Sequence, residues 1–94
     1  MKRETLRVAF RIERSGDPRS LTAVLPDIPA NPGRWACYAH VGQHAECDHG
    51  WYYTTRAATP MEYRALLREL RAIYERSDGL RLRVVQRIAR RERK

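Results

Sequence analysis

The sequence predicts an α+β domain in which a mostly antiparallel sheet of four to five strands carries one helix on one face, in the order β-β-β-β-α-β. Two observations lead to this class. Several short segments alternate apolar and polar residues with the period of a strand, and one later segment has the apolar stripe and capping residues of a helix. The 94 residues, 43% of them hydrophobic, suffice for one core but not for two, so residues 1–94 are expected to form a single domain.

The first two strands are predicted to form a hairpin. Residues 5–13 alternate apolar side chains with polar or small ones, which is typical of a strand with one buried face. Residues 15–18 are turn formers, and residues 21–25 then resume an extended apolar pattern. The prolines within residues 26–34 lack a backbone donor, so this segment is expected to be an irregular loop.

Two further strands are expected before the helix. Residues 35–42 alternate again, which predicts the third strand. Residues 43–50 are polar and are expected to form a loop. Residues 51–55, with the sequence Trp-Tyr-Tyr-Thr-Thr, have the aromatic and β-branched composition of a fourth strand.

The helix has the clearest local signal in the chain. Thr59 can cap the first free amides, Pro60 suits the first helical position, and Glu62 completes a capping box. Apolar residues then recur at helical spacing over residues 63–74, which predicts one buried stripe. The Ser-Asp-Gly of residues 77–79 is expected to end the helix.

The last strand is predicted over residues 80–88, and residues 89–94 are expected to form a basic, frayed tail. If the helix covers the apolar sheet face, which carries Leu6, Val8, Phe10, Leu80, Leu82 and Val84, the opposite face presents arginines. The fourth strand would add either Tyr52 and Arg56 or Trp51 and Tyr53 to that face. Arginines beside aromatic rings are typical of sheets that bind single-stranded nucleic acid, although a merely solvated face is the alternative. The residues expected to bind the partner are Arg7, Arg11, Tyr52, Arg56, Arg81, Arg83, Arg87, Arg90 and Arg91.

The charge of the chain is uneven along its length. Of the net charge of +8, residues 80–94 contribute +6, from seven basic residues and one acidic residue. Residues 1–14 contribute +3, from five basic and two acidic residues, whereas residues 15–79 hold seven basic and eight acidic residues. Basic ends around a nearly neutral middle indicate an anionic partner such as nucleic acid. The alternative is compositional, because seventeen of the nineteen basic residues are arginine, a bias that a GC-rich genome produces by itself.

Five potential zinc ligands fall within thirteen residues, and two thiolates with two imidazoles would satisfy a closed tetrahedral site. Strand geometry counts against the full set, because a strand through residues 35–42 points Cys37 into the core and His40 outward. Cys37 is then a small buried hydrophobe, which leaves a reduced site of His40, His44, Cys47 and His49 around the loop. The alternative to zinc is a polar loop ordered by histidine hydrogen bonds. The candidate metal ligands are Cys37, His40, His44, Cys47 and His49.

Cellular location is predicted from what the sequence lacks. The basic start of the chain is not followed by the apolar stretch of a secretory signal, and no run approaches the length needed to span a bilayer. We therefore expect a cytoplasmic protein. Its two cysteines are too few for a disulfide scaffold and are expected to be free thiols or metal ligands.

Three segments resemble small, functionally uncharacterised proteins of bacteriophages and integrative elements. They are Tyr38-Ala39-His40-Val41-Gly42-Gln43-His44, then Ala58-Thr59-Pro60-Met61-Glu62-Tyr63 with the leucines at 66 and 70, and Leu82-Arg83-Val84-Val85-Gln86-Arg87-Ile88. The resemblance covers residues 21–88. It implies an accessory protein of a mobile element, in the cytoplasm of a bacterial host, and it assigns no catalytic residue.

A binding function is expected rather than catalysis. The sequence has no glycine-rich phosphate loop, nucleophile elbow or paired-carboxylate motif. The catalytic alternative would use two of the histidines as general acid and base on a phosphodiester, with Arg56 or Arg34 steadying the phosphate. The expected partner is nucleic acid or a nucleic-acid-handling complex. A protein that inhibits a host complex, of anti-defence type, is the alternative, and an exposed sheet edge would allow a homodimer.

Overall fold

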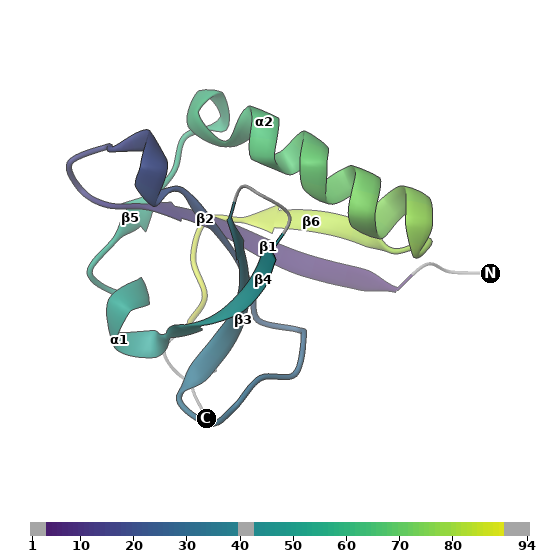
Figure 1. Cartoon of the computed structure of the whole chain (residues 1–94), viewed down its shortest axis with the longest axis horizontal. Coiled ribbons are helices and arrows are strands. Elements are labelled where there is room, and N and C mark those ends of the chain that lie inside the picture. The colour runs from purple at the N-terminus through teal and green to yellow at the C-terminus, as the bar shows by residue number, and fades with distance from the viewer. Residues whose placement is uncertain (1–3, 40–42, 90–94) are drawn as a thin grey trace.

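The structure, a computed structural model, describes residues 4–39 and 43–89 and confirms the α+β class (Figure 1). No helix in these two ranges is long and apolar enough to cross a membrane. The strands are β1 (Thr5–Ile12), β2 (Thr22–Leu25), β3 (Arg34–Ala39), β4 (Gln43–Asp48), β5 (Arg56–Ala57) and β6 (Arg81–Val85). The helices are a 3-10 turn (Pro18–Ser20), α1 (His49–Tyr52) and α2 (Pro60–Arg71), which continues as a π-helical end (Ala72–Ser77).

The strands form one mixed sheet that is mostly antiparallel. Strands β4, β3, β2, β1 and β5 lie side by side in that order and pair antiparallel. β6 pairs in parallel with β1, from Thr5 opposite Arg81 to Ala9 opposite Val85. Because Ala9 also pairs with Val24 of β2, β6 and β5 lie along the same edge of β1.

The main core lies between the sheet and α2, which runs along β1 and β6 in Figure 1. The helix contributes Leu66 and Leu70, both fully buried, against Val8 and Phe10 of β1. The sheet face predicted to meet the helix is confirmed, since Leu6, Val8, Phe10, Leu80, Leu82 and Val84 all belong to this core.

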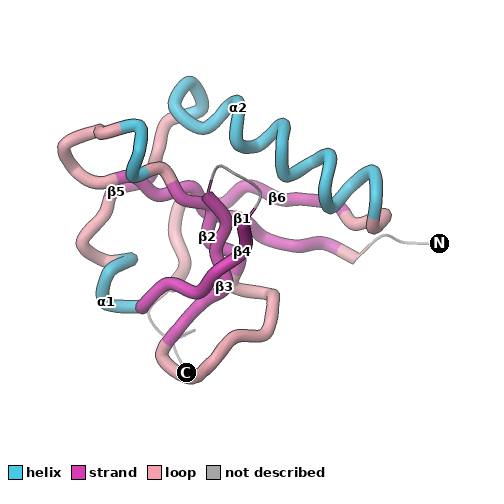
Figure 2. Tube along the Cα trace, viewed as in Figure 1, coloured by secondary structure: helices cyan, strands magenta, loops and turns pink. Residues whose placement is uncertain are grey.

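A second core cluster covers part of the opposite sheet face. It consists of Ala9, Val24, Trp35, Tyr52 and Ile88, with Trp51 and Tyr53 packed against it. In Figure 2 the short helix that supplies Tyr52 lies on the other side of the strands from α2. The face expected to be an open arginine surface is therefore partly closed by α1 and by the chain that follows β6.

Two element predictions between the third strand and the helix were wrong. Residues 43–48 form strand β4 rather than a loop, because every residue of that segment finds a partner on β3. Trp51 and Tyr52 lie in α1 rather than in a strand. The Asp48 side chain caps this helical turn by accepting a hydrogen bond from the Gly50 amide at 2.6 Å.

Candidate functional site

Arg7, a predicted partner-binding residue, is held within the fold. Its Nη2 donates to Asp27 Oδ1 at 2.9 Å, its Nε lies 3.2 Å from both carboxylate oxygens, and its backbone amide donates to Asp27 Oδ2. The Arg7 guanidinium holds the pKa of the Asp27 carboxyl below its usual value. This ion pair fastens the start of the loop between β2 and β3 to β1.

Arg11 and Tyr52 are buried, so the expectation that they stand on an open face was wrong. Arg11 is 8% exposed and Tyr52 is fully buried. Arg11 Nε donates to the Thr55 hydroxyl at 2.9 Å, Nη2 to the Thr55 carbonyl at 2.7 Å and Nη1 to the Gln86 carbonyl at 3.1 Å. The cause is α1, which places the Tyr52 ring over the sheet where the arginine was expected to meet solvent.

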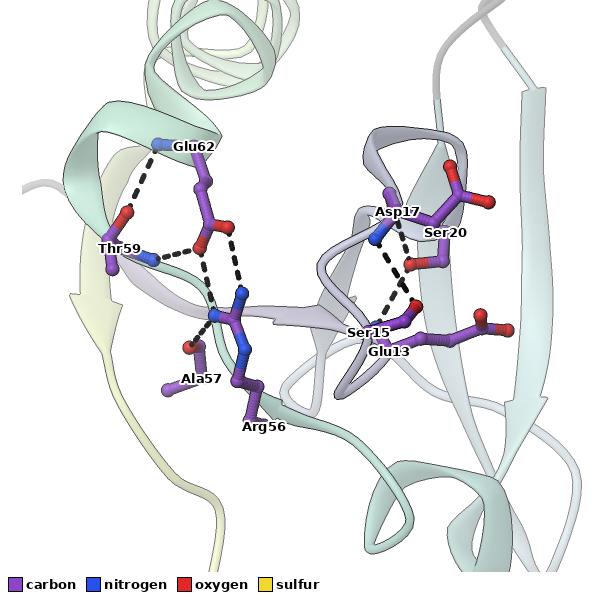
Figure 3. A network of polar contacts seen from close by, with 8 residues as sticks. All are labelled: Glu13, Ser15, Asp17, Ser20, Arg56, Ala57, Thr59 and Glu62. Atoms are coloured by element: carbon purple, nitrogen blue, oxygen red, sulfur yellow. Dashed lines mark hydrogen bonds and ion pairs between the residues drawn. The ribbon is translucent and has the colours of Figure 1, made fainter.

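Arg56 is paired with Glu62, a residue of the capping box at the start of α2 (Figure 3). Its two terminal nitrogens donate to the two carboxylate oxygens of Glu62, each at 2.9 Å. Glu62 also accepts the Thr59 backbone amide, and the Thr59 hydroxyl accepts the Glu62 amide, so the predicted capping box is confirmed. The Arg56 guanidinium and the Thr59 amide lower the pKa of Glu62 to about 2.

Three predicted residues form the exposed group that we call the arginine row: Arg81 and Arg83 on β6, and Arg87 beyond it. By strand alternation, Arg81 and Arg83 lie on the sheet face opposite α2, and Arg83 is the direct neighbour of Arg7. None of the three guanidinium groups has a carboxylate partner within residues 4–39 and 43–89. Arg90 and Arg91 lie outside the described residues.

The candidate metal ligands are divided between the two faces of the sheet. His44 lies on the α2 side, where its Nε2 is 2.5 Å from the Tyr74 hydroxyl. Cys47 packs against the second core cluster on the opposite side, and Cys37 shares that side by strand alternation. Within the described part of the chain, no three His, Cys, Asp or Glu side chains come together in a way that could hold a metal ion. His40 lies outside that part.

Both cysteines are free thiols. Cys37 is buried, as expected for a small hydrophobic residue. The Cys37 thiol and burial both raise the pKa of Cys47 far above the usual thiol value. Cys47 is therefore an uncharged thiol at neutral pH, which makes it a poor nucleophile.

A hollow of about 460 Å³ borders the second core cluster. Its lining is the loop of residues 26–32 together with Arg34, Trp35 and His49. The rings of Trp35 and His49 lie against each other with centroids 4.1 Å apart. His49 Nε2 is buried and has no hydrogen-bond partner in the described ranges. The proline content of the loop predicted irregular backbone, but no sequence spacing indicates a hollow whose lining comes from three separate segments.

Comparison of the chain with protein-family models found no match. Searches among curated proteins and among solved structures likewise found no similar protein.

Proposed function

We propose that this domain is a non-enzymatic accessory protein of phage or mobile-element type that binds nucleic acid, or a complex that handles it, in the bacterial cytoplasm. The arginine row would contact the phosphates, and Arg90 and Arg91 would extend the same basic segment along the chain. The proposed binding surface contains fewer residues than the predicted one, because Arg7, Arg11, Tyr52 and Arg56 are engaged within the fold.

The main support for the proposal is that two sets of arginines differ in whether they have acceptor partners within the fold. Arg7 and Arg56 each have a carboxylate, and Arg11 has three internal acceptors, whereas the described part of the chain offers the arginine row no carboxylate. Side chains two apart on a strand are about 6.6 Å from each other, so Arg81 and Arg83 present two charges side by side. Exposed, unneutralised guanidinium groups in a row favour a polyanion.

A protein that inhibits a host complex is the second candidate. The same arginines would then contact acidic side chains of that complex, with which Arg is well suited to form bidentate pairs. The two candidates predict different results when the protein is used to retain its partner from a host lysate. Retention from a host lysate that nuclease abolishes supports nucleic acid, whereas retention of one protein that resists nuclease and salt supports the inhibitor.

Charge reversal tests the proposal with a matched control. The variant Arg81→Glu, Arg83→Glu, Arg87→Glu is expected to lose at least about tenfold in affinity for DNA, because each lost phosphate contact removes favourable counterion release. The control reverses Arg64, Arg68 and Arg76 of the helix, which are exposed and lack a carboxylate partner in the described residues. It makes the same change in net charge on another element. Equal losses in the two variants would show that total charge, and not the arginine row, decides binding.

A further inference from the structure

The lining of the hollow beneath the loop of residues 26–32 includes residues from both core clusters, because Ile28 packs against the main core and Trp35 belongs to the second cluster. Trp35 and His49 of its lining belong to, or contact, the second core cluster on the face opposite α2. Asp27 also lines the hollow and is bound by Arg7, whose direct neighbour on β6 is Arg83. One ion pair therefore links the edge of the hollow to the row.

The lining combines apolar surface with one unneutralised cation. Most of the loop is proline, isoleucine or alanine, which offers apolar contact, and its three prolines have no backbone donor to satisfy. The Asp27 carboxylate is taken up by Arg7, so it does not neutralise Arg34. The exposed Arg34 guanidinium has no carboxylate partner in the described part of the chain. Such a lining fits a ligand with a flat apolar body and an anionic group.

We infer that the hollow is a subsite for one unpaired nucleotide of a single strand, with its base against the proline-rich loop and its phosphate on Arg34. The inference rests on the proposed function, because the strand would continue from the hollow onto the arginine row. The volume of about 460 Å³ falls within the usual range of small-molecule sites. Besides Arg34, the lining includes the ring of His49, which lies against the ring of Trp35.

A subsite of this kind makes the protein prefer a single strand to a duplex, which the arginine row alone does not do. Phosphate contacts are shared by single and double strands, whereas a base can enter a hollow only when it is unpaired. Burial of one unpaired base against this apolar lining should raise the affinity for a single strand about tenfold, which corresponds to about 1.4 kcal/mol. The domain should therefore bind a single strand more tightly than a duplex at equal salt.

Two variants of the lining test the inference, with affinities measured for an oligothymidylate strand and for a duplex of equal length. Arg34→Gln removes the cation, and Ala30→Phe fills the hollow from the loop. Each is expected to weaken single-strand binding about tenfold and to leave duplex binding unchanged. Arg64→Gln, an equal change of charge on the helix, should alter neither affinity.

The outcomes separate this inference from the proposed function. A parent protein that binds both forms equally, or lining variants that keep the parent's ratio of the two affinities, would overturn the subsite while the arginine row still binds DNA. A parent that binds neither form overturns both. Circular dichroism of each variant establishes that the fold is retained, and either lining variant suffices for the test.

Discussion

The guanidinium carbon of Arg11 lies 4.4 Å from the centroid of the Tyr52 ring, and the two side chains bury each other beneath helix α1. Arg11 also joins three parts of the chain, because its nitrogens donate to Thr55 after α1 and to Gln86 after β6. An arginine that the charge pattern assigns to a binding surface therefore contributes to stability instead.

Replacement of Arg11 by alanine is predicted to lower the free energy of unfolding by about 3 kcal/mol, because it leaves the buried acceptors of Thr55 and Gln86 unpaired. Urea denaturation measures the loss. Arg14→Ala is the control, since Arg14 is an exposed neighbour, and its cost should be about 0.5 kcal/mol or less. A stable Arg11→Ala protein that no longer binds nucleic acid would reverse the assignment and make Arg11 a contact residue.

Ile88 holds the chain after β6 against the sheet. Its side chain is fully buried, its amide donates to the Tyr52 hydroxyl at 2.8 Å, and its carbonyl accepts the Tyr53 hydroxyl at 3.0 Å. We predict that Ile88→Ala costs about 3 kcal/mol of unfolding free energy, through lost burial and the cavity left behind. Met61→Ala is the control, since Met61 is 79% exposed, and should change stability by about 0.5 kcal/mol or less. Equal costs in thermal or urea unfolding would contradict the packing of Ile88.

Glu62 is predicted to make the protein less stable as the pH becomes acidic. Its folded pKa of about 2 lies below the usual value of 4.5, so the ionised form is stabilised by folding. The contribution is fully present above about pH 5 and is lost as the pH falls through the folded pKa. In Glu62→Gln, unfolding free energy measured from pH 5 to pH 2 should fall less steeply than in the parent. Parallel curves for the two proteins would count against the Arg56 to Glu62 contact.

A pair of side chains joins the edge of the sheet to the helical layer. His44 on β4 lies 2.5 Å from the Tyr74 hydroxyl of the π-helical end, and burial raises the pKa of that hydroxyl. Tyr74 therefore keeps its proton at neutral pH, so its hydroxyl is available for a hydrogen bond with His44 Nε2. A double-mutant cycle of His44→Ala and Tyr74→Phe is predicted to give a coupling energy of about 1 kcal/mol. Strictly additive effects would show that the two groups do not interact in solution.

The predicted elements that the structure confirms are those with a strong local signal. The first strand has a regular alternation, and the helix has both halves of its capping box. β4 was missed because edge strands commonly carry charged and polar side chains, so the sequence of this strand resembles a polar loop. Residues 51–53 have the composition of a strand, but their rings are needed to cover the second sheet face, and the Asp48 cap allows a helical turn.

The candidate site was harder to predict because pairing partners are remote in sequence. Asp27 lies twenty residues from Arg7, and Thr55 lies forty-four from Arg11, so no local pattern reports that these arginines are engaged. The cluster of histidines and cysteines was predicted from closeness in sequence, which does not guarantee closeness in space. Its members are close in sequence, but the alternation of strands places His44 and Cys47 on opposite faces.

The salt dependence of the association constant for a single strand shows whether the arginine row binds nucleic acid through its phosphates. The affinity of the parent protein should fall steeply as the salt concentration rises. The logarithmic slope should be smaller by about three when Arg81, Arg83 and Arg87 are all reversed to glutamate, one for each lost phosphate contact. A parent protein whose affinity does not change with salt, or a reversed variant with the parent's slope, would contradict binding of nucleic acid by the arginine row.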